Sequence, residues 1–222
     1  MPGKKYVDRK KKILHASAKL FMEKGYTHTT MVEISRETGI EKTAVVRAFS
    51  SKENILAELV RYVLEGQFAA AEKFLDGVTT DKILYYAAET TLQLYITESN
   101  EQIRDLYLTA YSMPNASSVI RDAVTEKLEW IFKEHLPELK KADFYELEIA
   151  SGSIIRGFMA IPCGETFPME RKVNRYLETA LRIYQVPEEK IREAIAFVSQ
   201  FDYEKLAQQT IGQMLKHLEE VI

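Results

Sequence analysis

Two short segments with apolar residues at helical spacing flank a single glycine in ISRETGIEKTAVVRAF, residues 34–49. Isolated helices shorter than about 12–15 residues are marginal in water, so neither segment is stable alone. The chain must therefore brace both segments against a neighbouring helix. Gly39 supplies the positive φ that a tight turn between them needs. This stretch predicts a helical corner near the N-terminus.

The rest of the chain carries the same helical periodicity. Glycine and proline number only 9 and 6 in 222 residues, and no Asn-Gly or Asp-Gly turn joins alternating strands. The predicted fold class is therefore all-α, with an N-terminal three-helix helix-turn-helix domain (1–50) and a larger helical domain (51–222). The predicted helices span about residues 7–24, 31–38, 41–48, 51–75, 81–97, 101–112, 117–134, 144–161, 169–184, 188–200 and 203–220.

Two helix starts carry the pattern of a capping box, in which a hydroxyl side chain precedes a glutamate by three positions. Thr30 with Glu33 predicts the start of the second helix, and Ser50 with Glu53 predicts the start of the long fourth helix. Glycines at 25 and 39 suit the ends of the first and second helices.

A small core braces the helical corner and leaves one face of the third helix open. The expected core residues are Leu20, Phe21, Ile34, Ile40, Val45 and Phe49. The major groove of DNA is wide enough for one helix, and lysine and arginine suit guanine edges or phosphates there. The side chains expected on the open face are those of Lys42, Thr43, Val46 and Arg47.

Charge is divided unevenly along the chain. Residues 1–56 hold 12 Lys/Arg against 6 Asp/Glu, whereas the remainder holds 18 against 27. A basic head on an acidic body suggests that only the head meets a polyanion such as DNA. The N-terminal basic arm comprises Lys4, Lys5 and Arg9 to Lys12.

The segment ILHASAKLFMEKGYTHTTMVEISRETGIEKTAVVRAFSSKENIL (13–56) resembles the N-terminal domain of the TetR family of transcriptional regulators. The shared features are the pattern ILxAAxxLFxEKGYxxTT, the glycine turn, the lysine at 42 and the F(x)SKExL pattern that follows. The resemblance implies a homodimer on a double-stranded, palindromic DNA operator, released by a small-molecule effector. It implies phosphate contacts from Thr30 and Lys52, base contacts from Lys42, Thr43 and Ala44, and a base-edge or backbone contact from Arg47.

Three positions depart from the family pattern. Glu41 stands where serine is common, Val46 replaces a tyrosine that grips the backbone, and Ala48 replaces a histidine. Glu41 suits the N-terminal end of a helix dipole but repels a nearby phosphate. These departures predict an unusual operator or weaker binding.

The body is dense in tyrosine, and aromatic side chains with a polar tip suit a ligand cavity. The alternative is that these side chains are ordinary core or interface residues. The helix over 144–161 is the expected dimer helix because its small residues let a partner approach, although its partner helix is left open. The candidate effector-pocket residues are Tyr85, Tyr86, Arg104, Tyr107, Tyr111, Trp130, Arg156, Phe158 and Met159.

Nothing in the sequence indicates an enzyme, a metal site or a cofactor. The four histidines are scattered without a Glu-x-x-His pair, and no His-Glu-x-x-His, Gly-x-Ser-x-Gly or phosphate-binding glycine loop occurs. The single cysteine, Cys163, fits a reducing cytosol, and no apolar run suits a signal peptide or a spanning helix. We therefore expect a cytoplasmic protein without membrane contact.

Together these features predict a DNA-binding transcriptional regulator, a ligand-responsive repressor that acts as a homodimer. The alternative is a helical ligand-binding or scaffolding protein with only nonspecific affinity for DNA. Glu41 and Val46 are the residues that favour this alternative.

Overall fold

The computed structural model of the protein describes residues 4–220, with side chains described for all of these except 4, 5, 215 and 217–220. The all-α prediction is confirmed: the described residues contain helices and one isolated bridge between Gly164 and Phe167, but no strand. The helices are α1 (Lys4–Lys24), α2 (Met31–Thr38), α3 (Lys42–Phe49), α4 (Lys52–Leu75), α5 (Lys82–Glu98), α6 (Glu101–Ser112), α7 (Pro114–Phe132), α8 (Lys141–Ala160), α9 (Met169–Ile183), α10 (Glu188–Val198) and α11 (Tyr203–Glu220).

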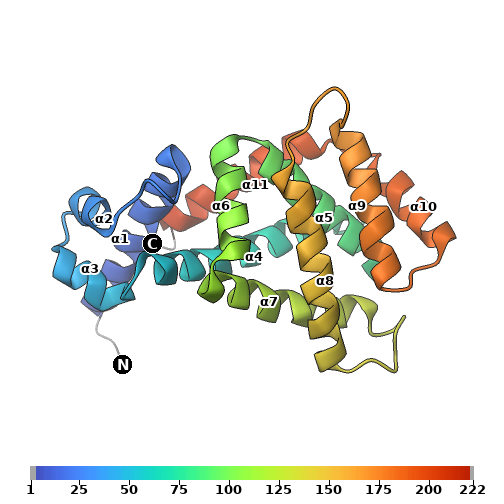
Figure 1. Ribbon diagram of the computed structural model, residues 1–222, viewed down its shortest axis with the longest axis horizontal. Helices are drawn as coiled ribbons and strands as arrows, with labels where there is room; N and C mark the ends of the chain where they lie inside the picture. The colour runs from blue at the N-terminus through green and yellow to red at the C-terminus, as the bar shows by residue number, and fades with distance from the viewer. Residues whose placement is uncertain (1–3, 221–222) are drawn as a thin grey trace.

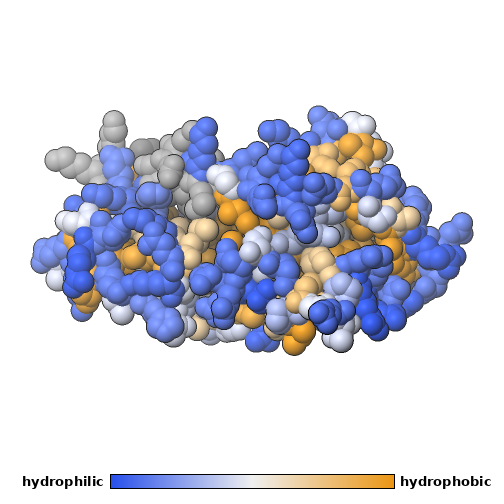
Figure 2. Space-filling model, turned by 90° about the horizontal axis from the view of Figure 1, so that it is seen from above, coloured by the Kyte–Doolittle hydropathy of each residue, from blue (hydrophilic) through white to orange (hydrophobic). Residues whose placement is uncertain are grey.

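The molecule is elongated, with α1–α3 forming a head at one end and α5–α10 forming the body (Figure 1). Helix α4 runs from the head into the body, and α11 runs back from the body toward the head. Helix α5 lies at the centre, with 13 of its 17 residues buried. From above, most of the surface is hydrophilic, and hydrophobic side chains gather mainly over the body (Figure 2).

Two apolar clusters form the core, and α4 contributes to both. The head cluster contains Phe21, Ile34 and Val45 together with Ile55 and Leu64 from α4. It continues into α6 and α7 through Ala110, Ala116 and Ile120. Ala71 and Leu75, near the other end of α4, belong to the body cluster. The head core thus extends past the predicted domain boundary at residue 50. Because α4 belongs to both clusters, a tilt of α4 changes the packing of the head and of the body.

The capping box at Thr30 is confirmed: its hydroxyl accepts the Glu33 N–H at 3.2 Å, and the Glu33 carboxylate accepts the Thr30 N–H at 2.8 Å. The box predicted at Ser50 is wrong. Ser50 has φ 59°, and Ser51 caps α4 instead by accepting the Asn54 N–H at 3.1 Å.

Helices α7 and α8 each begin three residues earlier than the hydrophobic pattern predicts. Helix α7 begins at Pro114, because the fixed φ of proline suits the first helical position, where its missing N–H costs nothing. Helix α8 begins at Lys141, where Asp143 accepts the Lys140 N–H at 2.6 Å. In both cases local capping chemistry extends the helix beyond its apolar stripe.

Candidate nucleic-acid interface and effector cavity

The turn between α2 and α3 is closed by local hydrogen bonds. Gly39 has φ 66° and ψ 15°, and its N–H donates to the Arg36 carbonyl at 3.3 Å. The Ser35 hydroxyl donates to the Ile40 carbonyl at 2.6 Å, which ties the far side of the turn to α2. These contacts set the angle between α2 and α3.

Helix α3 has one buried and one exposed face, as predicted. Val45, Ala48 and Phe49 are buried in the head core. The side chains of Lys42, Thr43, Val46 and Arg47 are exposed on the other face, whereas Ala44 is half-buried between the faces. Two cations and two methyl-bearing side chains therefore share one accessible helix face, a combination suited to phosphates, guanine edges and thymine methyl groups.

The positions that depart from the family pattern have different structural roles. Glu41 is exposed at the N-terminal end of α3 and makes no side-chain capping hydrogen bond there. Ala48 packs into the head core, so a small apolar side chain is what the fold needs at that position. Val46 is 39% exposed, an apolar group presented to the solvent on the face where the other side chains are polar.

Thr30, a predicted phosphate contact, is exposed at the start of α2. Its hydroxyl also donates to Glu33 at 2.9 Å, and Glu33 forms an ion pair with Lys24. The Lys24 ammonium, followed by the Thr30 hydrogen bonds, lowers the pKa of Glu33 to about 2. A carboxylate that stays ionised beside Thr30 opposes a phosphate at this end of α2, so the phosphate role of Thr30 stays a prediction.

Lys52, the other predicted phosphate contact, turns its ammonium back into the head. The Nζ atom donates to the Tyr26 and Thr29 carbonyls at 2.6 and 2.7 Å and lies 4.0 Å from the centre of the Tyr26 ring. Burial lowers the pKa of Lys52. An ammonium has three N–H donors, so one remains for a phosphate. Within the described residues, the main visible role of Lys52 is to tie α4 to the loop after α1.

The predicted basic arm is helical, because α1 begins at Lys4 rather than near residue 7. Arg9 and Lys12 are exposed, and the Lys10 ammonium lies 4.9 Å from the centre of the Phe49 ring. The side chains of Lys4 and Lys5 lie outside the described residues. Helix α1 thus places exposed cations beside the end of α3, which extends the basic surface of the head.

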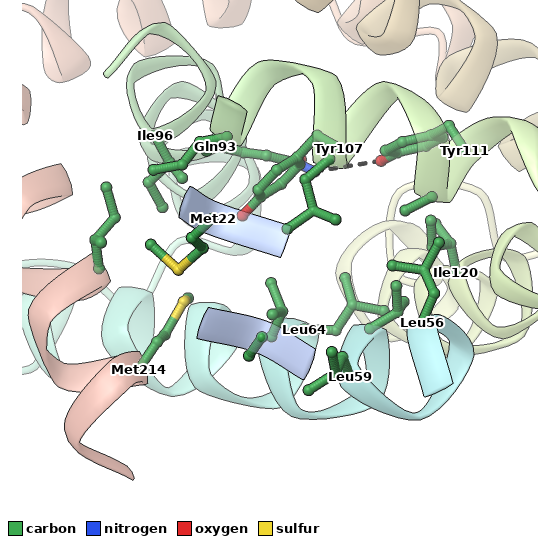
Figure 3. A pocket seen from close by; sticks show the side chains of 17 residues that line it. Met22, Leu56, Leu59, Leu64, Gln93, Ile96, Tyr107, Tyr111, Ile120 and Met214 are labelled. Carbon is green, nitrogen blue, oxygen red and sulfur yellow. Dashed lines mark hydrogen bonds between the residues drawn. The ribbon is translucent and has the colours of Figure 1, made fainter. Parts of the chain in front are cut away.

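An apolar cavity of about 110 Å³ lies where the head meets the body. Its walls come from α1, α4, α5, α6, α7 and α11, so a guest would touch helices of both parts of the molecule. The Met22 and Met214 side chains point toward one another across one end, and the leucines of α4 form the floor (Figure 3). Gln93, Tyr107 and Tyr111 are the polar groups on the facing wall, and the Gln93 amide donates to the Tyr111 hydroxyl at 3.2 Å.

A second, polar cavity of about 40 Å³ adjoins the first, and Leu64, Gln93 and Tyr111 line both. Gln67, Glu89, Glu148 and tyrosine hydroxyls surround it. The Tyr86 and Tyr176 hydroxyls lie 3.0 Å apart. The two cavities therefore share part of their walls: the first, where the head meets the body, is apolar, and the second, inside the body, has both polar and apolar walls.

Three of the nine predicted pocket residues, Tyr86, Tyr107 and Tyr111, line these cavities. The other six lie outside both. Tyr85 packs edge-on against Trp130, which is 46% exposed. Arg104 forms an ion pair with Glu98 at 2.8 Å, and Arg156 is exposed. Phe158 packs against Phe167 and Tyr176, and Met159 is buried in the body core.

Sequence reasoning missed both carboxylates of the polar cavity. The sequence does carry a signal for Glu89. It is the only charged residue between Lys82 and Glu98, in the middle of a predicted helix rich in apolar residues. A lone acid at such a position is expensive to bury unless it has a function or a partner. Glu148 has no comparable signal, because Glu146 and Asp143 stand close to it in the sequence and are not buried.

The predicted dimer helix, α8, keeps an apolar stripe on the outside of the body. Tyr145 and Ile149 are exposed on it, and Ile161 is exposed just beyond its end. Among the small residues of α8, Ala150, Ser153 and Gly157 are exposed, so the expected partner contact there stays a prediction. Ser151 points inward instead and accepts the Tyr184 hydroxyl at 2.7 Å.

Residues 4–220 offer neither a membrane span nor a metal centre. No described helix combines the length and apolar character needed to span a membrane. The described side chains also contain no group of three or more His, Cys, Asp or Glu placed to hold a metal ion.

Comparison with known proteins bears on the head. Residues 13–59 match the family model described as bacterial regulatory proteins, tetR family. The HTH-type transcriptional regulator HbdR of Aromatoleum sp. (strain CIB) is 31% identical over 72 residues, which cover 32% of this chain and 31% of that protein. The uncharacterized HTH-type transcriptional regulator YuxN of Bacillus subtilis (strain 168) is 29% identical over 112 residues, which cover 50% of this chain and 38% of that protein.

The chain thus spans about a third of the length of these curated relatives. Among solved structures, the TetR family transcriptional regulator PfmR from Thermus thermophilus aligns with a TM-score of 0.45 and 25% identity, covering 77% of this chain and 97% of that chain.

Proposed function

This chain belongs to the TetR family by its N-terminal DNA-binding domain, and from that premise we propose that it is a homodimeric, ligand-responsive repressor that binds a palindromic operator. The proposal places its action in the cytoplasm, where bacterial DNA is accessible. The observation that carries it is the exposed face of α3, on which Lys42 and Arg47 stand beside Thr43 and Val46.

The geometry of the head supports the proposed operator binding. A recognition helix in the major groove contacts base edges with a few side chains, and nearby cations fix its register on the phosphates. Lys42 and Arg47 supply the base or phosphate contacts from α3, and Arg9 and Lys12 add positive charge from α1. The exposed carboxylate of Glu41 disfavours a phosphate next to the start of α3, which narrows the operators that fit.

A two-fold symmetric dimer formed through α8 would match a palindromic operator. Tyr145 and Ile149 give this helix an exposed apolar face, and Ser153 and Gly157 allow a second helix to approach it. A two-fold axis there would present two copies of α3, and dimeric readers of this kind place their recognition helices about 34–36 Å apart, one turn of DNA.

The position of the apolar cavity supports the proposed response to an effector. Ala18 and Met22 of α1 line it together with Leu56, Leu59 and Val60 of α4. A guest that spreads these walls tilts α4 relative to α1 and changes the separation of the two recognition helices. A difference of only about 1–3 kcal/mol between the two states is enough for regulation.

The test is affinity selection of fragmented host genomic DNA by the purified 222-residue protein, followed by sequencing. We expect one palindrome to be enriched, and the Lys42→Ala/Arg47→Ala double variant to lose that enrichment. Undiminished enrichment by the double variant would overturn the assignment of α3.

The alternative function is a helical ligand-binding or scaffolding protein with nonspecific DNA affinity, favoured by Glu41 and Val46. A salt titration separates the two, because nonspecific attachment weakens steeply with salt and shows little preference among sequences. Equal binding to all fragments, with no enriched palindrome, would establish the alternative.

A further inference from the structure

Two buried carboxyl groups face the small polar cavity inside the body. Glu89 from α5 is 7% exposed and Glu148 from α8 is 2% exposed, and both line this cavity. Glutamate is almost never fully buried unless it is paired, because an ionised carboxylate loses its hydration there. Two such groups around one cavity require a physical reason.

Glu148 has an unused acceptor. Its Oε2 atom is buried and has no hydrogen-bond partner among the described residues. The other oxygen, Oε1, lies 2.7 Å from the point where a Cβ atom on residue 152 would stand. With any other residue at that position, the Glu148 carboxylate, the far end of a flexible side chain, would have to move from where it lies.

Glu89 is held in place by neutral partners. The Gln67 amide donates to its Oε1 atom at 2.5 Å, and the Tyr107 hydroxyl donates to Gln67 at 3.1 Å. Tyr107 lines the apolar cavity and Glu89 the polar one, so this hydrogen-bonded chain connects the two. It orients the Glu89 carboxylate without neutralising its charge.

No lysine or arginine among the described residues forms an ion pair with Glu89 or Glu148. Lys127 lines the cavity, but its ammonium pairs with Glu72 at 2.8 Å and lies over the rings of Trp130 and Tyr85.

The pKa values of the two carboxyls reflect this lack of counter-charge. Burial raises the pKa of Glu89 to about 7, although the Gln67 hydrogen bond and the Lys127 charge act against the rise. Burial also raises the pKa of Glu148 to about 7, with Arg121 lowering it and Asp122 raising it. A positive charge brought between them is therefore strongly favoured.

The remaining walls suit a cation with an apolar body. Tyr86, Tyr111 and Tyr176 line the polar cavity, and aromatic rings attract cations through their electron-rich faces. The adjoining apolar cavity measures about 110 Å³. An engineered protein cavity of about 150 Å³ holds benzene, so this smaller cavity suits a short alkyl chain or at most one ring.

From this arrangement we infer that the effector is a small cationic amphiphile, an amine with one aromatic or short alkyl group. Its ammonium lies between Glu89 and Glu148, and its apolar part passes Tyr111 into the cavity beside α1 and α4. The word effector rests on the proposed function, whereas binding of such a molecule rests on the two cavities alone. An anion would meet two carboxylates, and a neutral guest could donate a hydrogen bond to the Glu148 oxygen but would supply no counter-charge.

The test compares three probes with the same phenylbutyl skeleton on the 222-residue protein, without DNA: 4-phenylbutylamine, 4-phenylbutan-1-ol and 4-phenylbutanoate. Isothermal titration calorimetry at pH 7.5 gives each dissociation constant. We expect the amine to bind at least about tenfold more tightly than the alcohol, because hydrogen bonds to charged groups contribute about 1.5–3 kcal/mol. The carboxylate probe should bind most weakly.

Isosteric variants test whether Glu89 and Glu148 are the groups that bind the ammonium of the probe. Glu89→Gln and Glu148→Gln should each weaken amine binding about tenfold and leave alcohol binding unchanged. Glu146→Gln is the matched control, since Glu146 is exposed on the same helix as Glu148. Near pH 7, amine binding should also release protons, seen as a heat that varies with the ionisation enthalpy of the buffer, and each cavity variant should reduce that release.

The inference is overturned if the alcohol or the carboxylate binds as tightly as the amine, or if both cavity variants bind the amine like the unmodified protein. The proposed function is tested separately, by adding the amine to the protein bound to its selected DNA. Amine binding without DNA release would leave the cationic site standing and remove its regulatory role.

Discussion

The head and the body treat charge in opposite ways. On the head, Lys42 and Arg47 extend into solvent, where charge keeps its hydration at little cost. In the body, Glu89, Glu148 and Lys172 are buried among apolar helices. The head can therefore use charge against any large polyanion that approaches, whereas each charge of the body must have a partner within reach.

Lys172 and Glu148 show the two ways in which the body meets that requirement. The Lys172 ammonium donates to Glu98 at 2.7 Å and to the Ile161 carbonyl, so it is fully compensated within the chain. Although burial acts against ionisation, Lys172, the Cys163 N–H and Arg104 together hold the pKa of Glu98 below its ordinary value. Glu148 has no such partner, and for that reason we assign it to a binding site. The Lys172–Glu98 pair instead links α9 to α5.

The largest expected effect is on the buried ion pair. Lys172→Met should lower the free energy of unfolding by about 3 kcal/mol, because it leaves Glu98 partly buried without its main counter-charge. Urea unfolding followed by circular dichroism measures the loss. Arg182→Met is the control, since Arg182 and Glu188 are both more than half exposed and such pairs contribute at most about 1 kcal/mol. Equal losses in the two variants would contradict the contrast between buried and exposed charge.

Glu89→Gln should stabilise the protein at alkaline pH. The folded-state pKa of about 7 exceeds the ordinary value of 4.5, so the folded state binds more protons than the unfolded state between these values. Stability is therefore lost as pH rises through this window, by up to about 3 kcal/mol. The variant should be more stable than the unmodified protein at pH 8 and equally stable at pH 4.5. If the stability difference between the variant and the unmodified protein does not vary with pH, ionisation of Glu89 does not destabilise the folded state.

Lys42→Ala should act on DNA binding and not on stability. Removing one contact of a recognition helix costs about 1–3 kcal/mol of affinity for the selected operator, measured by fluorescence anisotropy. The free energy of unfolding should change by less than about 0.5 kcal/mol, because the side chain is exposed. Lys205→Ala, exposed at the start of α11, is the control and should leave the affinity unchanged. A large loss of stability in Lys42→Ala would mean that the Lys42 side chain stabilises the fold of the head.

The smallest effect is expected at the turn of the head. Gly39 has φ 66° with open space around its missing Cβ, so Gly39→Ala introduces backbone strain alone, about 1 kcal/mol. Gly212 lies within α11, also with open space, and Gly212→Ala should instead stabilise by about 0.5–1 kcal/mol. Thermal unfolding should therefore shift in opposite directions, and a stabilised Gly39→Ala variant would contradict the strained turn.

Helix periodicity and capping patterns were sufficient to predict all the helices of the described chain, because the contacts that form a helix join residues within four positions of each other. The same locality explains the two faces of α3, with Val45 inside and Lys42 outside. It also explains the errors: Ser50 and Ser51 are adjacent hydroxyl residues, and only the path of the backbone into α4 selects Ser51 as the cap.

The cavities depend on helices that are distant in the sequence, and local patterns carry no information about them. Tyr107 and Trp130 look alike as candidate ligand contacts, yet the packing of α6 against α4 turns Tyr107 into a cavity, and the position of α7 leaves Trp130 on the surface. Glu148 and Glu146 are two residues apart on one helix, and only one of them is buried. Which polar groups meet in the interior is set by how whole helices pack, since burial is a property of the assembled fold and not of a segment.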